Sequence, residues 1–108
     1  MSIQYQIFLG TDTNGHMPEA EARQLAFDLA AQYFPHGHSI REEMGRWQLE
    51  DGTCVTELTV VITWISTDEQ DLNGDGRKKV SGIAGAYKTR AHQEAVLVTE
   101  QAIEAILY

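Results

Sequence analysis

The sequence predicts an α+β protein, a ferredoxin-like β-α-β-β-α-β sandwich in which one antiparallel sheet carries two helices on one face. Three observations predict it. Apolar residues recur at period two in some segments and at helical spacing in others. These segments follow one another in the order strand, helix, strand, strand, helix, strand. An Asp51-Gly52 turn joins the two middle strands, and right-handed crossovers through the helices then give the ferredoxin-like topology.

The first strand and the first helix have the clearest patterns. Residues 3–9 alternate between an apolar face and a mostly polar face, and the apolar face consists of Ile3, Tyr5, Ile7 and Leu9. A polar loop covers residues 10–15. Pro18 suits the first turn of a helix, where its missing N–H costs nothing. An apolar stripe at spacings of three and four then runs to Phe34, and Pro35 ends the helix.

The hairpin over residues 39–66 is predicted to be the scaffold of the sheet. Its second strand holds the longest β-branched run, so we place this strand and the first strand in the centre of the sheet. Its core face is predicted to be Leu58, Val60, Ile62 and Trp64. In the strand over residues 39–50 the apolar parity changes at Gly45, which suggests a β-bulge there.

The second half of the chain repeats the strand–helix–strand arrangement less clearly. A polar loop covers residues 67–76, and the following helix contains Gly82 and Gly85, each of which costs about 1 kcal/mol relative to alanine. Residues 94–98 form the last predicted strand. Residues 100–108 fit either an extension of that strand past a bulge or a short helix, and we favour the strand.

Length, charge and cysteine content limit the class of protein. A chain of 108 residues is expected to form a single domain over residues 1–108. The net charge of -8 makes nucleic acid an unlikely partner, although basic residues gather between residues 77 and 90. One cysteine excludes an intrachain disulfide, and no run of ~18 apolar residues suggests a membrane span. We therefore expect a cytoplasmic protein of a bacterium or a bacterial virus.

Six short segments of this sequence occur in the same order in other small proteins. They are Phe8-Leu9-Gly10, Phe34-Pro35-His36-Gly37, Gly45-Arg46-Trp47, Glu57, Ala86-Tyr87-Lys88 and Gln93-Glu94-Ala95-Val96-Leu97. In this the chain resembles a family of small uncharacterised bacterial proteins over nearly its whole length. The resemblance implies a ferredoxin-like fold, and it implies no activity, cofactor or catalytic residue. Many relatives carry export or lipoprotein signals, and because this sequence shows none, a periplasmic role is not expected.

One acidic loop has the spacing of a calcium site. Asp71, Asn73 and Asp75 follow the D-x-N-x-D-G pattern, which places oxygen ligands around a glycine turn. However, Lys79 and Gly82 stand at the ninth and twelfth positions, and a bidentate carboxylate is expected at the twelfth. A solvated turn before a helix is therefore the favoured interpretation, and we assign no metal.

A carboxylate and the histidines are the other groups with possible chemistry. Glu57 is the only charged residue of the central strand and lies near Glu42 and Glu43 on the neighbouring strand. Such a group can act as a catalytic acid or base, or it can pair with Arg41 or Arg46 across the sheet, which is the simpler interpretation. The histidines have no spacing that fixes three zinc ligands, so we expect them on surface loops.

The sheet face opposite the helices is the candidate ligand-binding or interface surface. It mixes apolar and polar side chains, as shallow ligand sites and interfaces do. Its candidate residues are Gln4, Gln6, Phe8, Glu57, Thr59, Val61 and Thr63, together with Trp47.

Three functions fit these observations, and no nucleophile motif or phosphate loop selects one. The leading hypothesis is a non-enzymatic interaction module, without a cofactor, that forms a homodimer or binds a protein partner through the open sheet face or a sheet edge. The alternative is a small enzyme or ligand-binding protein of the dimeric α+β barrel type, with Glu57, Trp47 and the histidines near a cavity. A third is an acidic inhibitor from a mobile element that mimics nucleic-acid phosphates.

Overall fold

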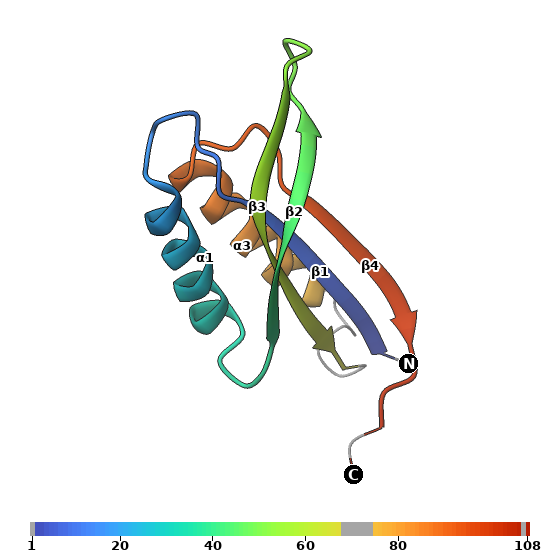
Figure 1. The fold of residues 1–108 in the computed structure, drawn as a ribbon. Helices are drawn as coiled ribbons and strands as arrows, with labels where there is room; N and C mark the ends of the chain where they lie inside the picture. Colours follow the sequence, from blue (N-terminus) through green and yellow to red (C-terminus); the bar gives the residue numbers. More distant parts are fainter. Residues whose placement is uncertain (1, 68–74, 107) are drawn as a thin grey trace.

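The computed structural model describes residues 2–67, 75–106 and 108, and it confirms the predicted ferredoxin-like fold. The elements follow the predicted order β-α-β-β-α-β (Figure 1). They are β1 (Ser2–Gly10), α1 (Glu19–Tyr33), β2 (Ser39–Gln48), β3 (Cys54–Ser66), α3 (Asp75–Arg90) and β4 (Leu97–Ile103).

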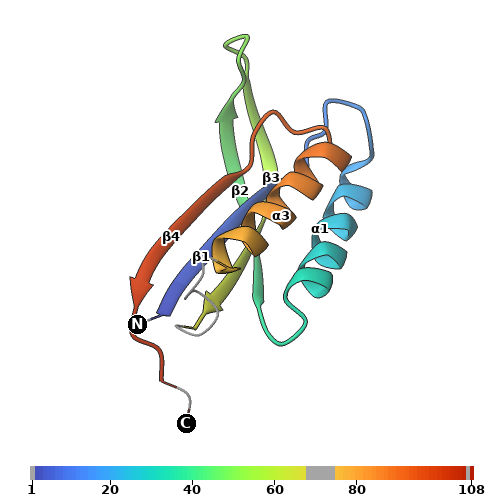
Figure 2. The same cartoon turned by 180° about the vertical axis from the view of Figure 1, so that it is seen from behind.

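All neighbouring strands of the sheet are antiparallel, in the order β2-β3-β1-β4. The two strands predicted to be central, β1 and β3, are central. Both helices pack on one face, seen in front of the sheet in Figure 2, and no helix of the described residues lies on the other face. Strand β1 ends where Gly10 pairs with Thr59. The outer end of β3 continues beyond this point, and there β2 is its one neighbouring strand among the described residues.

The core lies between the sheet and the two helices. Alternate residues of β1 and β3 meet the apolar stripe of α1 and the buried face of α3, as the periodicity predicts. Trp64 stacks between Tyr5 and Phe34, with ring centroids 5.8 and 4.7 Å apart respectively. The Lys79 ammonium lies 5.4 Å from the Trp64 ring centroid and 6.0 Å from the Phe34 ring centroid, so a cation lies against this aromatic stack.

The predicted β-bulge at Gly45 is wrong. Strands β2 and β3 pair in one unbroken register from Ser39–Thr63 to Gln48–Cys54. The parity change has another cause: the hairpin extends past the helix layer (Figure 1), so its outer part has no core on the helix side. Ile40 therefore packs toward the helices, whereas Trp47 lies on the opposite face of the sheet.

The last strand begins and ends differently from the prediction. It starts at Leu97 rather than Glu94 and continues to Ile103, so the sheet takes in part of the segment that sequence left open. Residues 104–106 have no regular structure. Arg77 of α3 forms an ion pair with Glu100 of β4 at 2.7 Å, which links the basic start of that helix to the edge strand.

The molecule measures 43 × 25 × 23 Å, and its long axis reflects the projecting hairpin (Figure 1). Among the described residues, no helix has the length and apolar character that crossing a membrane requires.

Candidate functional site

A cavity of about 360 Å³ lies on the open sheet face, beneath the projecting hairpin. The outer part of the hairpin forms one side, the segment that leads into β4 forms the other, and the end of β1 lies between them. Its lining residues come from these segments and from the loop after β1: Phe8, Gly10, Asp12, Asn14, His16, Trp47, Gln48, Leu49, Val55, Glu57, His92, Gln93, Glu94, Ala95, Val96 and Leu97.

Glu57 is the central polar group of this cavity. Its carboxylate lies directly over Gly10, where any β-carbon would overlap it, so the glycine provides the space that the carboxylate occupies. Oε2 accepts a hydrogen bond from the backbone N–H of Asp12 at 2.6 Å. Burial raises the pKa of Glu57 above its usual range, and the Asp12 N–H bond opposes that rise. A half-buried carboxylate in a cavity is suited to hold a cation or to exchange a proton.

The cavity wall is acidic. Asp12, Glu57 and Glu94 contribute carboxylates, and the lining contains no lysine or arginine among the described residues. Phosphate recognition in proteins relies on such cations or on helix N-termini. The wall therefore favours a neutral or cationic ligand over a phosphorylated one.

Two loops are fastened together at the rim of the cavity. The rings of His16 and His92 stack with their centroids 3.9 Å apart. The Gln93 side-chain amide donates a hydrogen bond to the Asp12 carbonyl at 2.8 Å. These contacts hold the loop after β1 against the segment before β4, so the Asp12 N–H that bonds Glu57 is itself held in position.

Tyr87 supports the site from the helix side of the sheet. Its side chain is fully buried, and its hydroxyl donates a hydrogen bond to the Gly10 carbonyl at 2.6 Å. Burial, together with the nearby charge of Glu57, raises the pKa of the Tyr87 phenol well above its ordinary value. The hydroxyl therefore remains a donor at any physiological pH and fixes the end of β1 beneath the carboxylate.

The structure brings together only part of the predicted surface. Phe8, Trp47 and Glu57 line the cavity. The register places the remaining candidates on the same sheet face but outside the cavity lining: Gln4, Gln6, Thr59, Val61 and Thr63. Thr59 and Val61 are completely buried, although they lie on the sheet face that carries no described helix. They are thus not accessible to a partner in this conformation.

The predicted pairing of Glu57 with Arg41 or Arg46 across the sheet is not found among the described residues. Among the described residues no ion pair joins Glu57 to Arg41 or Arg46, and Arg41 pairs with Glu43 instead, at 3.1 Å. Glu42 faces the helix side of the sheet and pairs with Arg23 of α1, so it is not part of the site. Glu57 is therefore the one carboxylate of the predicted three that enters the cavity.

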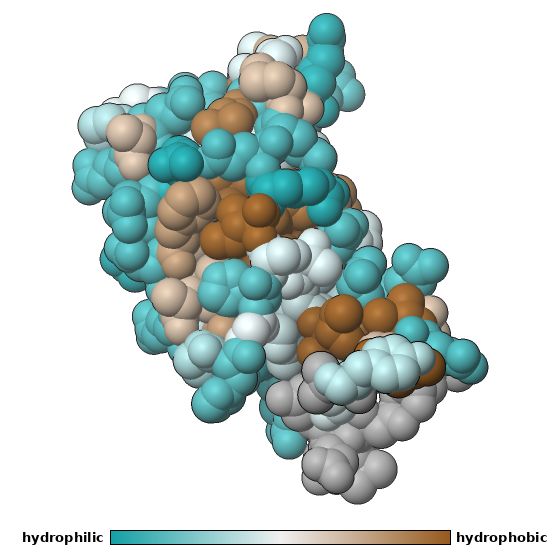
Figure 3. Space-filling view, turned by 60° about the horizontal axis from the view of Figure 1, so that its bottom comes forward, coloured by the Kyte–Doolittle hydropathy of each residue, from teal (hydrophilic) through white to brown (hydrophobic). Residues whose placement is uncertain are grey.

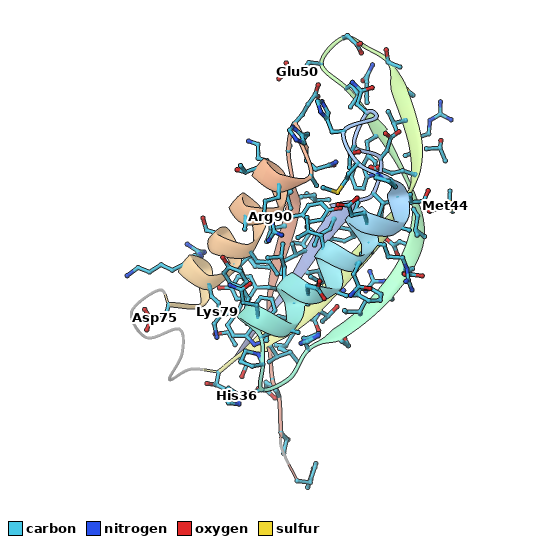
Figure 4. All side chains as sticks on the ribbon, turned by 90° about the vertical axis from the view of Figure 1, so that its left-hand side faces the viewer. His36, Met44, Glu50, Asp75, Lys79 and Arg90 are labelled. Carbon is cyan, nitrogen blue, oxygen red and sulfur yellow. The ribbon has the colours of Figure 1, made fainter. Side chains whose placement is uncertain are left out.

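The histidines divide into two pairs. His16 and His92 lie at the rim, as the ligand-binding alternative expects. His36 and His38 line a second and more open hollow of about 440 Å³ at the other end of the molecule. In Figure 4, His36 lies at the end of the domain opposite to the hairpin residue Glu50. Among the described residues that line this second hollow there is no carboxylate.

The calcium-like loop gains no support. Asp71 and Asn73 lie outside the described residues, and Asp75 is the first residue of α3. No group of three or more histidine, cysteine or acidic side chains among the described residues could hold a metal ion.

Sequence periodicity did not identify several residues of the site. Gly10, Asp12 and Gln93 belong to it through long-range contacts rather than through any local pattern. The family resemblance did point to the site, because residues from four of the six segments that carry it line the cavity. A fifth segment contributes Tyr87, which supports Gly10. The shared pattern therefore describes one site as well as a fold.

Together, the fold and the cavity define a ferredoxin-like α+β protein with a small acidic site on its open sheet face. The chain belongs to the family described as "Protein of unknown function (DUF3574)", whose model matches residues 4–106. This confirms the resemblance seen in the sequence.

Solved structures show the same fold at low sequence identity. A phage SAM lyase in complex with S-methyl-5'-thioadenosine has a TM-score of 0.71 at 21% identity, covering 93% of this chain and 80% of the lyase. A phage SAM lyase in the apo state has a TM-score of 0.62 at 23% identity, with 92% and 78% covered. CutA from Synechococcus elongatus PCC7942 has a TM-score of 0.52 at 12% identity, with 94% and 76% covered. No curated protein matches the chain.

Proposed function

We propose that this protein binds a small adenosyl compound in the Glu57 cavity and acts as a lyase on S-adenosylmethionine. The observation that carries the proposal is the half-buried Glu57 carboxylate, set among aromatic side chains in a cavity without lysine or arginine in its described lining. This is the enzyme or ligand-binding alternative predicted from the sequence. The fold shared with a phage SAM lyase adds support at the level of architecture.

The chemical character of the cavity suits this ligand class. Trp47 and Phe8 offer aromatic surface on which a purine can stack. A volume of about 360 Å³ is at the lower end of ordinary ligand sites, which suits a nucleoside with one substituent better than a dinucleotide. S-Adenosylmethionine carries no phosphate, in agreement with the acidic wall.

We assign to Glu57 the role of binding the sulfonium group of S-adenosylmethionine. Cleaving the carbon–sulfur bond to the amino-acid chain returns the bonding electron pair to sulfur, so S-methyl-5'-thioadenosine departs as a neutral thioether and needs no acid. An oxygen of the substrate's own carboxylate supplies the electron pair to the carbon that loses sulfur, which closes a lactone and consumes no second substrate. The site must then hold the cation in place and keep water away. A partly desolvated carboxylate can hold the cation in place, because the attraction between opposite charges is stronger in a partly buried site than in water.

Incubation with S-adenosylmethionine and chromatographic detection of S-methyl-5'-thioadenosine tests this proposal. We expect the thioether to form with the wild-type protein and its rate of formation to fall by about 100-fold or more in Glu57→Gln. Glu43→Gln is the matched control, because Glu43 is an exposed carboxylate on the same sheet face outside the cavity. The proposal is wrong if the wild type neither forms the thioether nor binds it at millimolar concentration.

Self-association through the open sheet face is a second proposal, and a separate observation favours it. Apolar side chains gather in patches on the surface (Figure 3). On the open sheet face Ile65 and Leu97 are 42% and 47% exposed. Light scattering at increasing concentration should show a dimer that Leu97→Glu disrupts. A wild-type monomer at high concentration would rule it out.

A further inference from the structure

Two buried polar atoms on the hairpin have no hydrogen-bond partner among the described residues. They are Nε1 of Trp47 and Oγ1 of Thr59. Both lie over Gly45: a β-carbon at that glycine would be 2.6 Å from the indole nitrogen and 2.5 Å from the hydroxyl oxygen. The absence of a side chain at Gly45 therefore lets the indole lie back along β2 and cover the threonine.

Such an arrangement is unusual in a protein interior. Buried donors and acceptors are nearly always paired, and exceptions often mark a functional position. Thr59 has no exposed surface at all, whereas the indole that covers it also lines the Glu57 cavity. The register places Trp47, Thr59 and Glu57 on the same face of the sheet, so a rotation of the indole away from Gly45 would expose the threonine hydroxyl on the face that carries Glu57.

We propose that Trp47 Nε1 and Thr59 Oγ1 form a subsite for a carboxylate oxygen of the ligand, which is reached when the indole turns off Gly45. This inference rests on the proposed function and defines the substrate more closely. The indole N–H can only donate, and the threonine hydroxyl can also donate, so the pair suits an oxygen that accepts two hydrogen bonds.

Glu57 completes the recognition of a zwitterion. Glu57 is the β3 partner of Gly45, over which the two donors lie, and its carboxylate lies over Gly10 on the β1 side of the same sheet face. In S-adenosylmethionine the sulfonium and the ammonium belong to one short chain. Both cationic groups can therefore face Glu57 while the carboxylate of the ligand binds Trp47 and Thr59. An α-amino acid end has this chemistry, and the site therefore selects adenosyl ligands that keep the amino acid over those that have lost it.

The affinities of two thioethers distinguish binding at this subsite from binding in the rest of the cavity. S-Adenosylhomocysteine carries an amino acid on its sulfur, and S-methyl-5'-thioadenosine carries a methyl group instead. We expect calorimetry with the wild type to show about tenfold or tighter binding of S-adenosylhomocysteine. The ratio of the two affinities should fall toward one in Thr59→Val, which keeps the shape of the side chain and removes the hydroxyl.

Trp47→Phe provides an independent variant. It keeps an aromatic ring and removes the N–H, so the affinity ratio should fall again even if both ligands bind more weakly. Thr99→Val makes the same chemical change at an exposed site of the open face outside the cavity, and its ratio should equal that of the wild type. Because Thr59 Oγ1 has no partner in the described residues, Thr59→Val is expected to fold.

The outcomes separate this inference from the function on which it rests. If both ligands bind the wild type with equal affinity, or if neither Thr59→Val nor Trp47→Phe lowers the affinity ratio, the carboxylate subsite is wrong and the adenosyl site stands. If neither ligand binds the wild type and no thioether forms from S-adenosylmethionine, both are wrong.

Discussion

Glu57 illustrates at the residue scale how a functional group costs stability. Its carboxylate is held over Gly10 by one backbone N–H, and burial raises its pKa. A carboxyl group whose pKa is higher in the folded protein than in the unfolded chain binds protons more readily when folded. The free energy of unfolding therefore falls as the pH rises through the interval between the two pKa values.

Glu57→Gln should consequently be at least as stable as the wild type at pH 7. The amide keeps an oxygen that accepts the Asp12 N–H and carries no charge to desolvate. The difference in melting temperature should shrink as the pH falls toward the ordinary carboxyl value of 4.5, because the wild-type side chain then becomes neutral too. Calorimetric melting across this range checks it, and a Gln variant that is less stable at pH 7 but not at pH 4.5 would contradict this account.

Tyr87 makes the opposite contribution at the same site. Replacing it with phenylalanine removes the buried hydroxyl donor from the Gly10 carbonyl, which should lower the free energy of unfolding by about 1–3 kcal/mol. Tyr33→Phe is the control, because Tyr33 is a half-buried residue whose hydroxyl has no hydrogen bond in the described part of the chain. Urea denaturation compares the two variants, and equal effects would show that the Tyr87 bond is not important.

At the element scale, the helices and the hairpin show where sequence patterns are sufficient. The stripe of α1 and the alternation of β1 are local patterns, and both elements form where predicted. The parity change at Gly45 was also visible, but its meaning depended on how far the hairpin extends past the helices. That length relative to the helix layer is a property of the packed molecule, so the sequence suggested a bulge where there is a change of face.

The two glycines of α3 should behave differently on substitution. A β-carbon at Gly85 meets nothing within 4 Å, so Gly85→Ala should raise the free energy of unfolding by about 1 kcal/mol through helix propensity. At Gly82 the added carbon would lie 3.0 Å from the Tyr33 ring, which should cancel much of this gain. Urea denaturation of both variants tests the difference, and a larger gain at Gly82 would contradict the packing described.

At the scale of the whole molecule, the fold was predictable and the site was predictable only in part. Four amphipathic strands and two helices leave few topologies once crossovers are right-handed. Glu57 and Trp47 could be nominated because they interrupt the pattern of their strands. The residues on the opposite side of the cavity could not be predicted in this way. Their position depends on where β4 begins and on contacts between distant parts of the chain, such as the hydrogen bond from Gln93 to Asp12.

One titration tests the central claim, which is that the Glu57 cavity and not another surface binds the ligand. Amide nuclear magnetic resonance spectra of the ¹⁵N-labelled protein are recorded while S-methyl-5'-thioadenosine is added. We predict shifts concentrated at residues 8–12, at Trp47 and Glu57, and at residues 92–97, with the His36–His38 end unchanged. Spectra that do not change, or that change mainly at His36 and His38, would contradict the assignment of this cavity.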